Sequence, residues 1–407
     1  MRDGTDRRSG VWPALRTVLI ALFFAAPLLS GLVNRAVDRD PFTMPDYGAI
    51  ACGAEKLAAG EPLYETGRRQ NCEGYESPAY LYPPFLAGVV LGLQASFGPE
   101  GARALYFSVY LAAIGYLLWT AFLASGPPGA RHDRFKYIGL ITATPIWFAN
   151  VALIVHAVIV YAAQAAMRRP AILMAVLVAA SMVKLSFLTC VLVFACLPMP
   201  VWKRIALSTL TAIAGIGAVT AFMQTGGEAA LLWRESLAYV AFEWVPGNGA
   251  MGWAVRMGAP DAAAVAIALV FAALVALSAL LICEQGEADV RQRVFIGLAA
   301  AVLAMPRIMP YDVFLLAPGM VAIVELAVKA DARLGLWARR AALAGCVGAV
   351  VMSLAGYADQ RLDVALALFA AALFLSAWAH RTFDVRAFLA RAERSAKQHG
   401  NPRSTEL

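Results

Sequence analysis

Apolar runs of about 15–24 residues recur along almost the whole of this sequence, and clusters of arginine and lysine separate them. A helix needs about 20 apolar residues to cross the hydrocarbon core of a bilayer, so these runs predict membrane-spanning helices. Of the 407 residues, 61% are hydrophobic and 15% are charged. A soluble domain has about 45–50% apolar and about 25% charged residues. The sequence therefore predicts an all-α, polytopic membrane protein.

The apolar runs predict about twelve membrane-spanning helices in a single domain that covers residues 1–390. Residues 391–407 are polar, and we expect them to form a disordered cytoplasmic tail. A further apolar piece, Tyr137–Ala149, is broken by Pro145, and we expect it to lie outside the membrane or to re-enter it. The expected spans are 11–34, 82–97, 103–125, 150–167, 171–184, 186–201, 205–224, 261–283, 293–305, 311–328, 341–356 and 363–380.

The basic residues indicate how the chain is oriented. A net charge of +7 can indicate nucleic-acid binding in a soluble protein, but here the basic residues lie between apolar runs and set topology instead. The positive-inside rule places both termini in the cytoplasm. One loop conflicts with this arrangement, because the basic segment Gly126–Lys136 would lie outside.

This orientation gathers polar residues on the external side. Asp46, Asn150, Lys184, the loop Trp233–Trp253 and the segment Pro306–Asp312 all fall there. Polar groups at the ends of spans cost little, but their presence at one face predicts a site.

Asp46 is the strongest candidate for a catalytic group. It precedes a helical pattern over Tyr47–Ala59 in the first external loop. A carboxylate there can act as a general base toward an acceptor hydroxyl, as carboxylates do in glycosyl chemistry. The alternative is that Asp46 only caps the helix that follows. Asp38 and Asp40 are the second choices for the base.

Three short motifs carry a family resemblance. The sequence has Asp46-Tyr47, then Gly60-Glu61-Pro62-Leu63-Tyr64, then Tyr82-Pro83-Pro84. In this order and in this loop, they resemble glycosyltransferase family 87, a group of polyprenyl-phosphate-dependent membrane glycosyltransferases. Tyr82-Pro83-Pro84 is a marker of the family, and we give it no chemical role.

The resemblance implies a GT-C-type fold and an inverting hexosyltransferase, with mannose the favoured sugar. The donor would be a sugar on polyprenyl phosphate, and the acceptor a glycan or glycolipid at the periplasmic face of a bacterial inner membrane. The partners would otherwise be membrane lipids, with no nucleic acid. In such an enzyme Asp46 would remove the acceptor proton.

Two cations are candidates for binding the donor phosphate. Lys184 ends an apolar run, where an ammonium either reaches the interface, forms an ion pair or contacts phosphate. Arg307 can bind phosphate with its planar fork, or pair with Asp312 and join two helix ends. We expect substrate contacts from Tyr47, Asn150, Asn248, Tyr311 and Asp312.

The remaining titratable residues suggest structural roles. His156 lies within an apolar run and is expected to be a hydrogen-bonded packing residue. Cys52 and Cys72 lie in the first loop, where they form a disulfide in an oxidising compartment or remain free thiols. The sequence contains no nucleotide-binding or zinc motif. We predict no cofactor, because no dense group of carboxylates supports a divalent metal.

Two other functions compete with this one. A lipid or sugar transporter would have its site near the middle of the bilayer, with internally repeated halves. A glycan polymerase or ligase that uses diphosphate-linked donors would rely more on arginine in its external loops. The sequence shows no internal repeat, which favours the transferase over the transporter.

Overall fold

Seven helices are long and apolar enough to cross a membrane, in a computed structural model that describes residues 11–37, 44–64, 70–72, 75–77, 80–357 and 360–381. Three further apolar helices are shorter. The prediction of a helical, polytopic membrane protein is confirmed at this level. The seven are Leu15–Val37, Pro84–Leu123, Val201–Thr225, Asp261–Gln285, Asp312–Ala330, Ala332–Leu354 and Arg361–Ala379.

A single small hairpin accompanies the helices among the described residues. The strands β1 (Gln70–Cys72) and β2 (Tyr75–Ser77) pair in antiparallel fashion. The helices are α1 (Val11–Val37), α2 (Pro45–Ala59), α3 (Pro84–Leu118), α4 (Arg131–Phe135), α5 (Ala143–Trp147), α6 (Val151–Ala165), α7 (Pro170–Val183), α8 (Leu192–Cys196), α9 (Val201–Thr225), α10 (Gly227–Tyr239), α11 (Ala250–Arg256), α12 (Asp261–Gln285), α13 (Val290–Leu303), α14 (Leu316–Ala330), α15 (Ala332–Leu354) and α16 (Arg361–Ala379).

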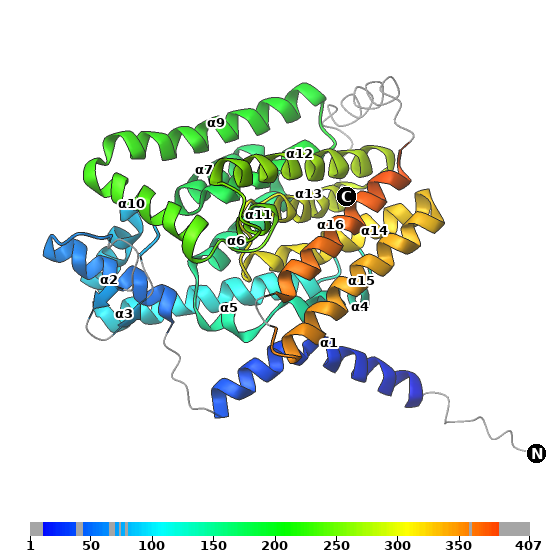
Figure 1. Ribbon diagram of the computed structural model, residues 1–407, viewed down its shortest axis with the longest axis horizontal. Helices are drawn as coiled ribbons and strands as arrows, with labels where there is room; N and C mark the ends of the chain where they lie inside the picture. Colours follow the sequence, from blue (N-terminus) through cyan, green and yellow to red (C-terminus); the bar gives the residue numbers. More distant parts are fainter. Residues whose placement is uncertain are drawn as a thin grey trace, which may run out of the picture.

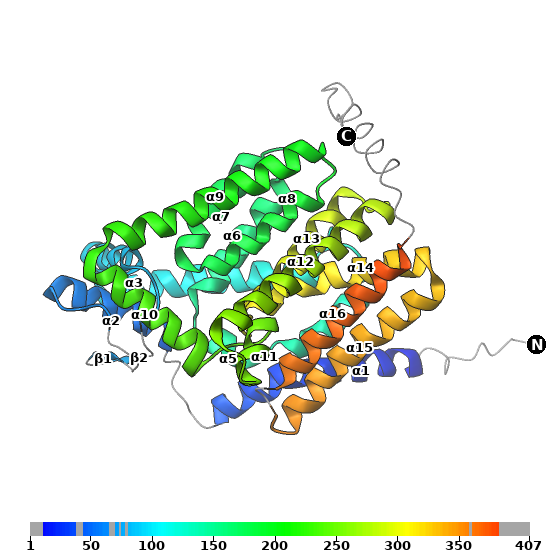
Figure 2. The same ribbon diagram turned by 45° about the horizontal axis from the view of Figure 1, so that its top comes forward.

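The first polar stretch folds into α2, the hairpin and the start of α3. These elements lie with α10 at one side of the molecule (Figures 1 and 2). Gly98 interrupts α3 with φ 72° and ψ 167°, a conformation that glycine adopts without steric cost. Pro99 follows it and begins the second half of the helix. The break lies between the expected spans 82–97 and 103–125.

The helices α13 and α14 form the buried centre of the bundle. Nearly all of their side chains are buried. They pack closely because Gly319 has no side chain, and a Cβ there would collide with the Phe295 carbonyl. Around them lie α12, α15 and α16 (Figure 1).

The helix α14 and the turn before it, Asp312–Ala330, define two ends of the bundle. These 19 residues extend about 28 Å at the helical rise of about 1.5 Å per residue. Asp312 lies at the end that we call the Asp46 end. At the other end Leu326 lies against Gly286 and His380, close to Glu284. We call this the Glu284 end.

The basic loop Gly126–Lys136 lies at the Glu284 end. Asp133 and Lys136 line a cavity together with Glu325 and Lys329 from the last turns of α14. The sequence prediction placed this loop on the same side as Asp46, so that placement is wrong.

The error arose in the segment that follows the loop. Lys136 lies at the Glu284 end, whereas Ala149 precedes Asn150 at the Asp46 end. The segment Tyr137–Ala149 therefore runs from one end of the bundle to the other and packs against α1 on the way. Its short helical pieces, broken at Pro145, lack the long periodic run by which a span is recognised.

A buried ion cluster holds the Glu284 end together. Glu284 Oε1 lies 2.6 Å from Nη1 of both Arg204 and Arg293. The arginines also donate to backbone carbonyls of Met199, Ala195, Ala288 and Cys196. Hydrogen bonds to three chain segments therefore fix both guanidinium groups.

Candidate active site

Asp46 lies in the first turn of α2 and does not cap it. The capping residue is Met44, which is left-handed with φ 47° and makes no side-chain capping bond. The Asp46 backbone N–H donates to the Phe148 carbonyl at 3.1 Å. The alternative that Asp46 is an N-cap is therefore contradicted, and its carboxylate is free for other contacts.

Asn150, at the start of α6, binds that carboxylate. Its Nδ2 donates to Asp46 Oδ2 at 2.8 Å and lies 3.2 Å from the Tyr82 hydroxyl. Its Oδ1 accepts from the Ala152 N–H at 2.8 Å and caps α6. Because both halves of the amide are used, Asn150 has one fixed orientation toward Asp46.

Burial changes the acidity of Asp46. It raises the pKa of this carboxyl to about 6, while the hydrogen bond from Asn150 lowers it. A carboxylate with a pKa of about 6 is a stronger base than an ordinary aspartate, yet it is still ionised near neutral pH. The arrangement therefore suits proton abstraction.

Tyrosine side chains position the Asn150 turn. Tyr106 donates its hydroxyl to the Ala149 carbonyl at 2.6 Å, and Tyr110 donates to the Pro145 carbonyl at 2.8 Å. Ala149 is held in a left-handed conformation with φ 54°. The ring of Tyr47 packs 4.7 Å from that of Tyr106 and is only 2% exposed. We therefore assign Tyr47 to packing, in place of the substrate contact expected from the sequence.

A second buried cluster surrounds Asp312. One carboxylate oxygen lies 2.7 Å from Lys184 Nζ and accepts from the Met309 N–H at 2.8 Å. The other lies 2.9 Å from His156 Nε2. Asp312 therefore pairs with Lys184, and the expected ion pair between Arg307 and Asp312 is not formed. Of the alternatives given for Lys184, the structure shows the ion pair and not a side chain that extends to the membrane interface.

His156 is a buried, hydrogen-bonded packing residue, as the sequence predicts. Its side chain has no exposed surface and contacts the Asp312 carboxylate directly. The available signal was that ionisable residues inside membrane helices usually have a functional partner. The partner itself lies 156 positions away, so no local pattern could identify it.

Tyr82 and Tyr311 connect the two clusters. Burial raises the pKa of Tyr82, and the charges of Asp46 and Tyr311 raise it further, so Tyr82 lies near both. The Lys184 ammonium lies 5.0 Å from the centre of the Tyr311 ring. Tyr82 therefore belongs to the Asp46 cluster through Asn150, and Tyr311 belongs to the Asp312 cluster through Lys184. From the sequence we gave Tyr82 no chemical role. The hydrogen bond that its hydroxyl accepts from Asn150 corrects that assignment.

Arg307 is positioned by the loop after α10. Its Nε donates to the Val245 carbonyl at 2.9 Å. Asn248 and Ile308 exchange two backbone hydrogen bonds of 2.8 Å. Gly247, with φ 74°, lies against the Arg307 side chain, and a Cβ at this position would collide with it. Asn248 therefore fixes the Arg307 segment, and its side-chain amide also donates to Ile308.

Trp233 in α10 and Trp253 in α11 make structural contacts. Trp233 Nε1 donates to the Leu81 carbonyl at 2.9 Å, and Trp253 Nε1 donates to Asp363 at 2.7 Å. The Trp233 contact supports the segment that carries Tyr82.

Cysteine chemistry differs between the two ends. Cys52 and Cys72 form a disulfide with a Cα–Cα distance of 5.7 Å, which joins α2 to the hairpin. Cys190, Cys196, Cys283 and Cys346 are buried free thiols. Among the residues described, no group of three His, Cys, Asp or Glu side chains could hold a metal ion. Asp38, Asp40 and the tail 391–407 lie outside the described residues.

Comparison of the chain with protein-family models, with curated proteins and with solved structures finds no match. The arguments about function therefore rest on the sequence motifs and on the geometry of the Asp46 end.

Proposed function

We propose that this protein is a membrane glycosyltransferase that moves a hexose or pentose, with mannose favoured, from polyprenyl phosphate to a glycan or glycolipid hydroxyl. The observation that carries the proposal is the environment of Asp46. It is a buried carboxylate with a pKa raised to about 6, held in one orientation by Asn150 and connected to a cluster of cations. A base and cations near a common point are what glycosyl transfer from a phosphate donor requires.

In the proposed reaction, Asp46 takes the proton of the acceptor hydroxyl as its oxygen bonds to the anomeric carbon of the donor sugar. The bond between that carbon and the phosphate oxygen breaks on the opposite face, so the configuration inverts. The released phosphate carries the electron pair. Lys184 and Arg307 would stabilise this charge, because their contacts with Asp312 and the Val245 carbonyl fix both cations before the reaction begins.

Asp312 and His156 act on Lys184 rather than on the substrate. An ammonium has three N–H donors, and the 2.7 Å contact with Asp312 uses one of them. The ammonium therefore keeps donors for a phosphate while the buried carboxylate fixes its position. Tyr311 and Tyr82 form the aromatic wall between the base and the cations.

The change Asp46→Asn tests the proposal. Asn keeps the size of the side chain and removes the proton acceptor, so turnover should fall by about 10²–10⁴-fold. Stability should be nearly unchanged, because Asp46 is not the cap of α2. The measurement is sugar transfer from a polyprenyl-phosphate donor by equal amounts of folded protein. Glu55→Gln, an exposed carboxylate on the same helix, is the matched control. Near wild-type transfer by Asp46→Asn would refute the assignment.

We further propose a GT-C-type arrangement with twelve crossings, both termini in the cytoplasm of a bacterial inner membrane and the Asp46 end outside. The segment Tyr137–Ala149 takes the place of the expected span 82–97. This exchange brings the basic loop Gly126–Lys136 to the same side as the other basic loops, as the positive-inside rule requires. The Cys52–Cys72 disulfide in the first loop supports the same orientation.

Cysteine labelling of intact cells tests this orientation. A cysteine at Gly67, outside the described residues, should react with an impermeant reagent. A cysteine at Ala130 should react only after permeabilisation. The reverse result would place Asp46 in the cytoplasm and exclude an external donor site.

A lipid or sugar transporter is the second candidate. It is favoured by the break between α7 and α8, where Lys184 adopts an extended conformation beside a buried ion cluster. If Asp46→Asn and Lys184→Met both leave glycan composition unchanged but abolish movement of a lipid-linked sugar across vesicle membranes, this reading replaces the transferase.

A further inference from the structure

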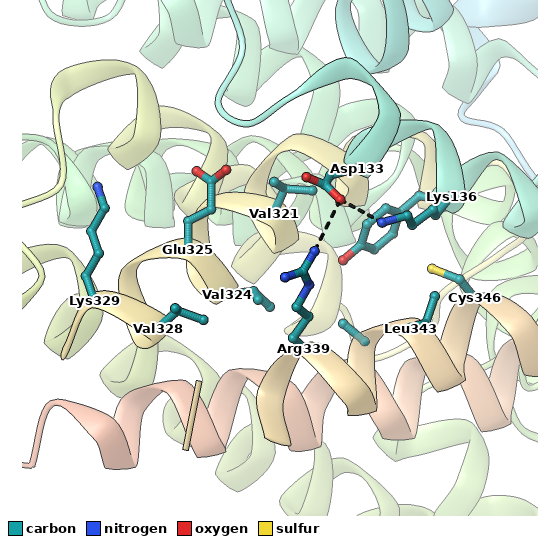
Figure 3. Close-up of a pocket in the computed structure, with 12 residues that line it drawn as sticks. Asp133, Lys136, Val321, Val324, Glu325, Val328, Lys329, Arg339, Leu343 and Cys346 are labelled. Carbon is teal, nitrogen blue, oxygen red and sulfur yellow. Dashed lines mark hydrogen bonds and ion pairs between the residues drawn. The ribbon is translucent and has the colours of Figure 1, made fainter. Parts of the chain in front are cut away.

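A cavity of about 480 Å³ opens at the Glu284 end, on the far side of the bundle from Asp46. Figure 3 shows the residues that line it. The cavity lies between α14, α15 and the segment Arg131–Lys136. The two helices approach each other most closely where Gly335 meets the Val328 backbone. Beyond this point they leave a space with a volume in the range of small-molecule sites, about 300–1,000 Å³.

The cavity has charges of both signs on its walls. Asp133 is neutralised within the protein, because Lys136 Nζ lies 2.6 Å from its carboxylate. Arg339 reaches the same carboxylate only at 3.9 Å, and its side chain is 61% exposed. This distance is too long for a hydrogen bond, so the guanidinium keeps its donors for another group.

Glu325 and Lys329 are one helical turn apart on α14 and could pair with each other. Across the described chain, however, neither forms an ion pair within 4.0 Å. Figure 3 shows Glu325 and Lys329 side by side along one wall and Arg339 on the facing helix. The cavity therefore offers two cations and one carboxylate that form no hydrogen-bonded ion pair among the described residues.

The rim of the cavity is apolar. Val328 is 41% exposed and Leu343 is 43% exposed, although both line the cavity. They belong to helices that are long and apolar enough to cross a membrane. An occupant with a polar, doubly charged head and a hydrocarbon chain would match both the walls and the rim.

We propose that this cavity binds the headgroup of a phospholipid that carries both a phosphate and a primary ammonium, such as phosphatidylethanolamine. The phosphate accepts hydrogen bonds from Arg339 and Lys329. The ammonium donates to Glu325, and an acyl chain lies along Val328 and Leu343. This site is separate from the proposed transferase chemistry and depends only on the protein being in a membrane.

Lipid competition on the full-length protein tests the proposal. The protein is placed in nanodiscs with equal amounts of phosphatidylethanolamine, phosphatidylcholine and phosphatidylglycerol, and retained lipid is counted by native mass spectrometry. Retention of phosphatidylethanolamine should exceed that of phosphatidylcholine about tenfold, because a quaternary ammonium cannot donate to Glu325. Phosphatidylglycerol, which lacks the amine, should also be retained less.

Three variants assign the contacts. The double change Lys329→Gln and Arg339→Gln should reduce retained phosphatidylethanolamine about tenfold. Glu325→Gln should keep phospholipid but lose the preference for the primary amine. Arg340→Gln is the matched control, because Arg340 neighbours Arg339 but stacks on Trp337 and should retain lipid as the wild type does.

Several results would overturn the proposal. Equal retention by the double variant and the wild type would place the lipid elsewhere. Equal retention of the choline and ethanolamine lipids would remove the ammonium contact, and complete displacement by inorganic phosphate would make this a site for free phosphate. If a variant does not fold, a photoactivatable ethanolamine lipid on the wild-type protein decides. Crosslinks outside 133–137, 321–329 and 339–346 would contradict the site.

Discussion

The molecule contains two buried carboxylates that each lie between two basic side chains, one at each end of the bundle. Glu284 lies between Arg204 and Arg293, and Asp312 lies between Lys184 and His156. The arginines cannot lose their charge in a protein, and they also bond to several backbone carbonyls. The cluster at Glu284 therefore keeps its charges and is fixed in position.

The Asp312 cluster has a different composition. A lysine and a histidine replace the two arginines, and the ammonium of Lys184 makes a single ion pair and lies over the rings of Phe187 and Tyr311. Lys184 also stands at a break between helices rather than within one. The comparison teaches that the same charge pattern can join helices at one end and present a cation to a ligand at the other.

Removing one cation from each cluster should give opposite results. Lys184→Met should lower turnover by about 10²–10³-fold, because one donor to the leaving phosphate is lost. Arg204→Met should leave turnover per folded molecule unchanged but destabilise the protein by about 3–5 kcal/mol, because Glu284 loses a buried partner. The measurements are sugar transfer and thermal unfolding in detergent.

The control for this pair is Lys203→Met, which removes a half-buried basic residue next to Arg204 that forms no ion pair within the described part of the chain. It should change neither quantity. If folded Arg204→Met protein is inactive, the division between a structural end and a chemical end fails.

Reduction should affect only the Asp46 end. The Cys52–Cys72 disulfide closes a loop with a sequence separation of 20, so the change Cys72→Ser should cost about 3 kcal/mol. The expected result is a lower unfolding temperature of the variant. Cys196→Ser, at a buried free thiol near the Glu284 cluster, is the comparison and should lose stability on reduction as the wild type does, because it keeps the disulfide.

Mass spectrometry under non-reducing conditions can detect the result that would contradict this prediction. Free thiols at both Cys52 and Cys72 would remove the disulfide. They would also remove its support for the external orientation of this end.

Both the rate of sugar transfer and the stability of the protein should depend on pH through Asp46. With the pKa of Asp46 raised to about 6 from 3.8, transfer should fall about tenfold per pH unit below about 6, because the base becomes protonated. The stability contribution has the opposite sign. A raised carboxyl pKa means that the folded state binds the proton more tightly, so this contribution declines as pH rises from about 4 to about 6.

Asn150→Ser sharpens the pH prediction. Serine can still cap α6 but is too short to reach Asp46 with an amide. Loss of the hydrogen bond that lowers the pKa of Asp46 should move the acid limb of the pH–rate profile to higher pH. A limb that stays in place would show that Asn150 does not act on the base.

The sequence predicted the helical membrane fold well, because long apolar runs have few alternative structures. It also placed Asp46, Asn150, Lys184 and Asp312 at one face. It could not predict their partners, since the pairs Asp46–Asn150 and Lys184–Asp312 join residues 104 and 128 positions apart.

The errors have physical causes. Tyr137–Ala149 crosses the bundle with short helical pieces and an extended turn, so its hydrophobic pattern has no helical period. Aspartate is a preferred N-cap residue, but Met44 takes that position, and the Asp46 N–H is bound by the Phe148 carbonyl. Both outcomes depend on contacts between distant segments, which local propensity does not contain.

Met44 and Ala149 have one further consequence. Each is a non-glycine residue with left-handed backbone geometry, a conformation that costs about 1–2 kcal/mol, and each stands just before one partner of the Asp46–Asn150 pair. Glycine would relieve that cost at either position while allowing the pair to drift apart. Selection for thermal stability and selection for activity would therefore favour different residues at these two positions. Laboratory evolution for stability alone should accept glycine there and lose activity as a result.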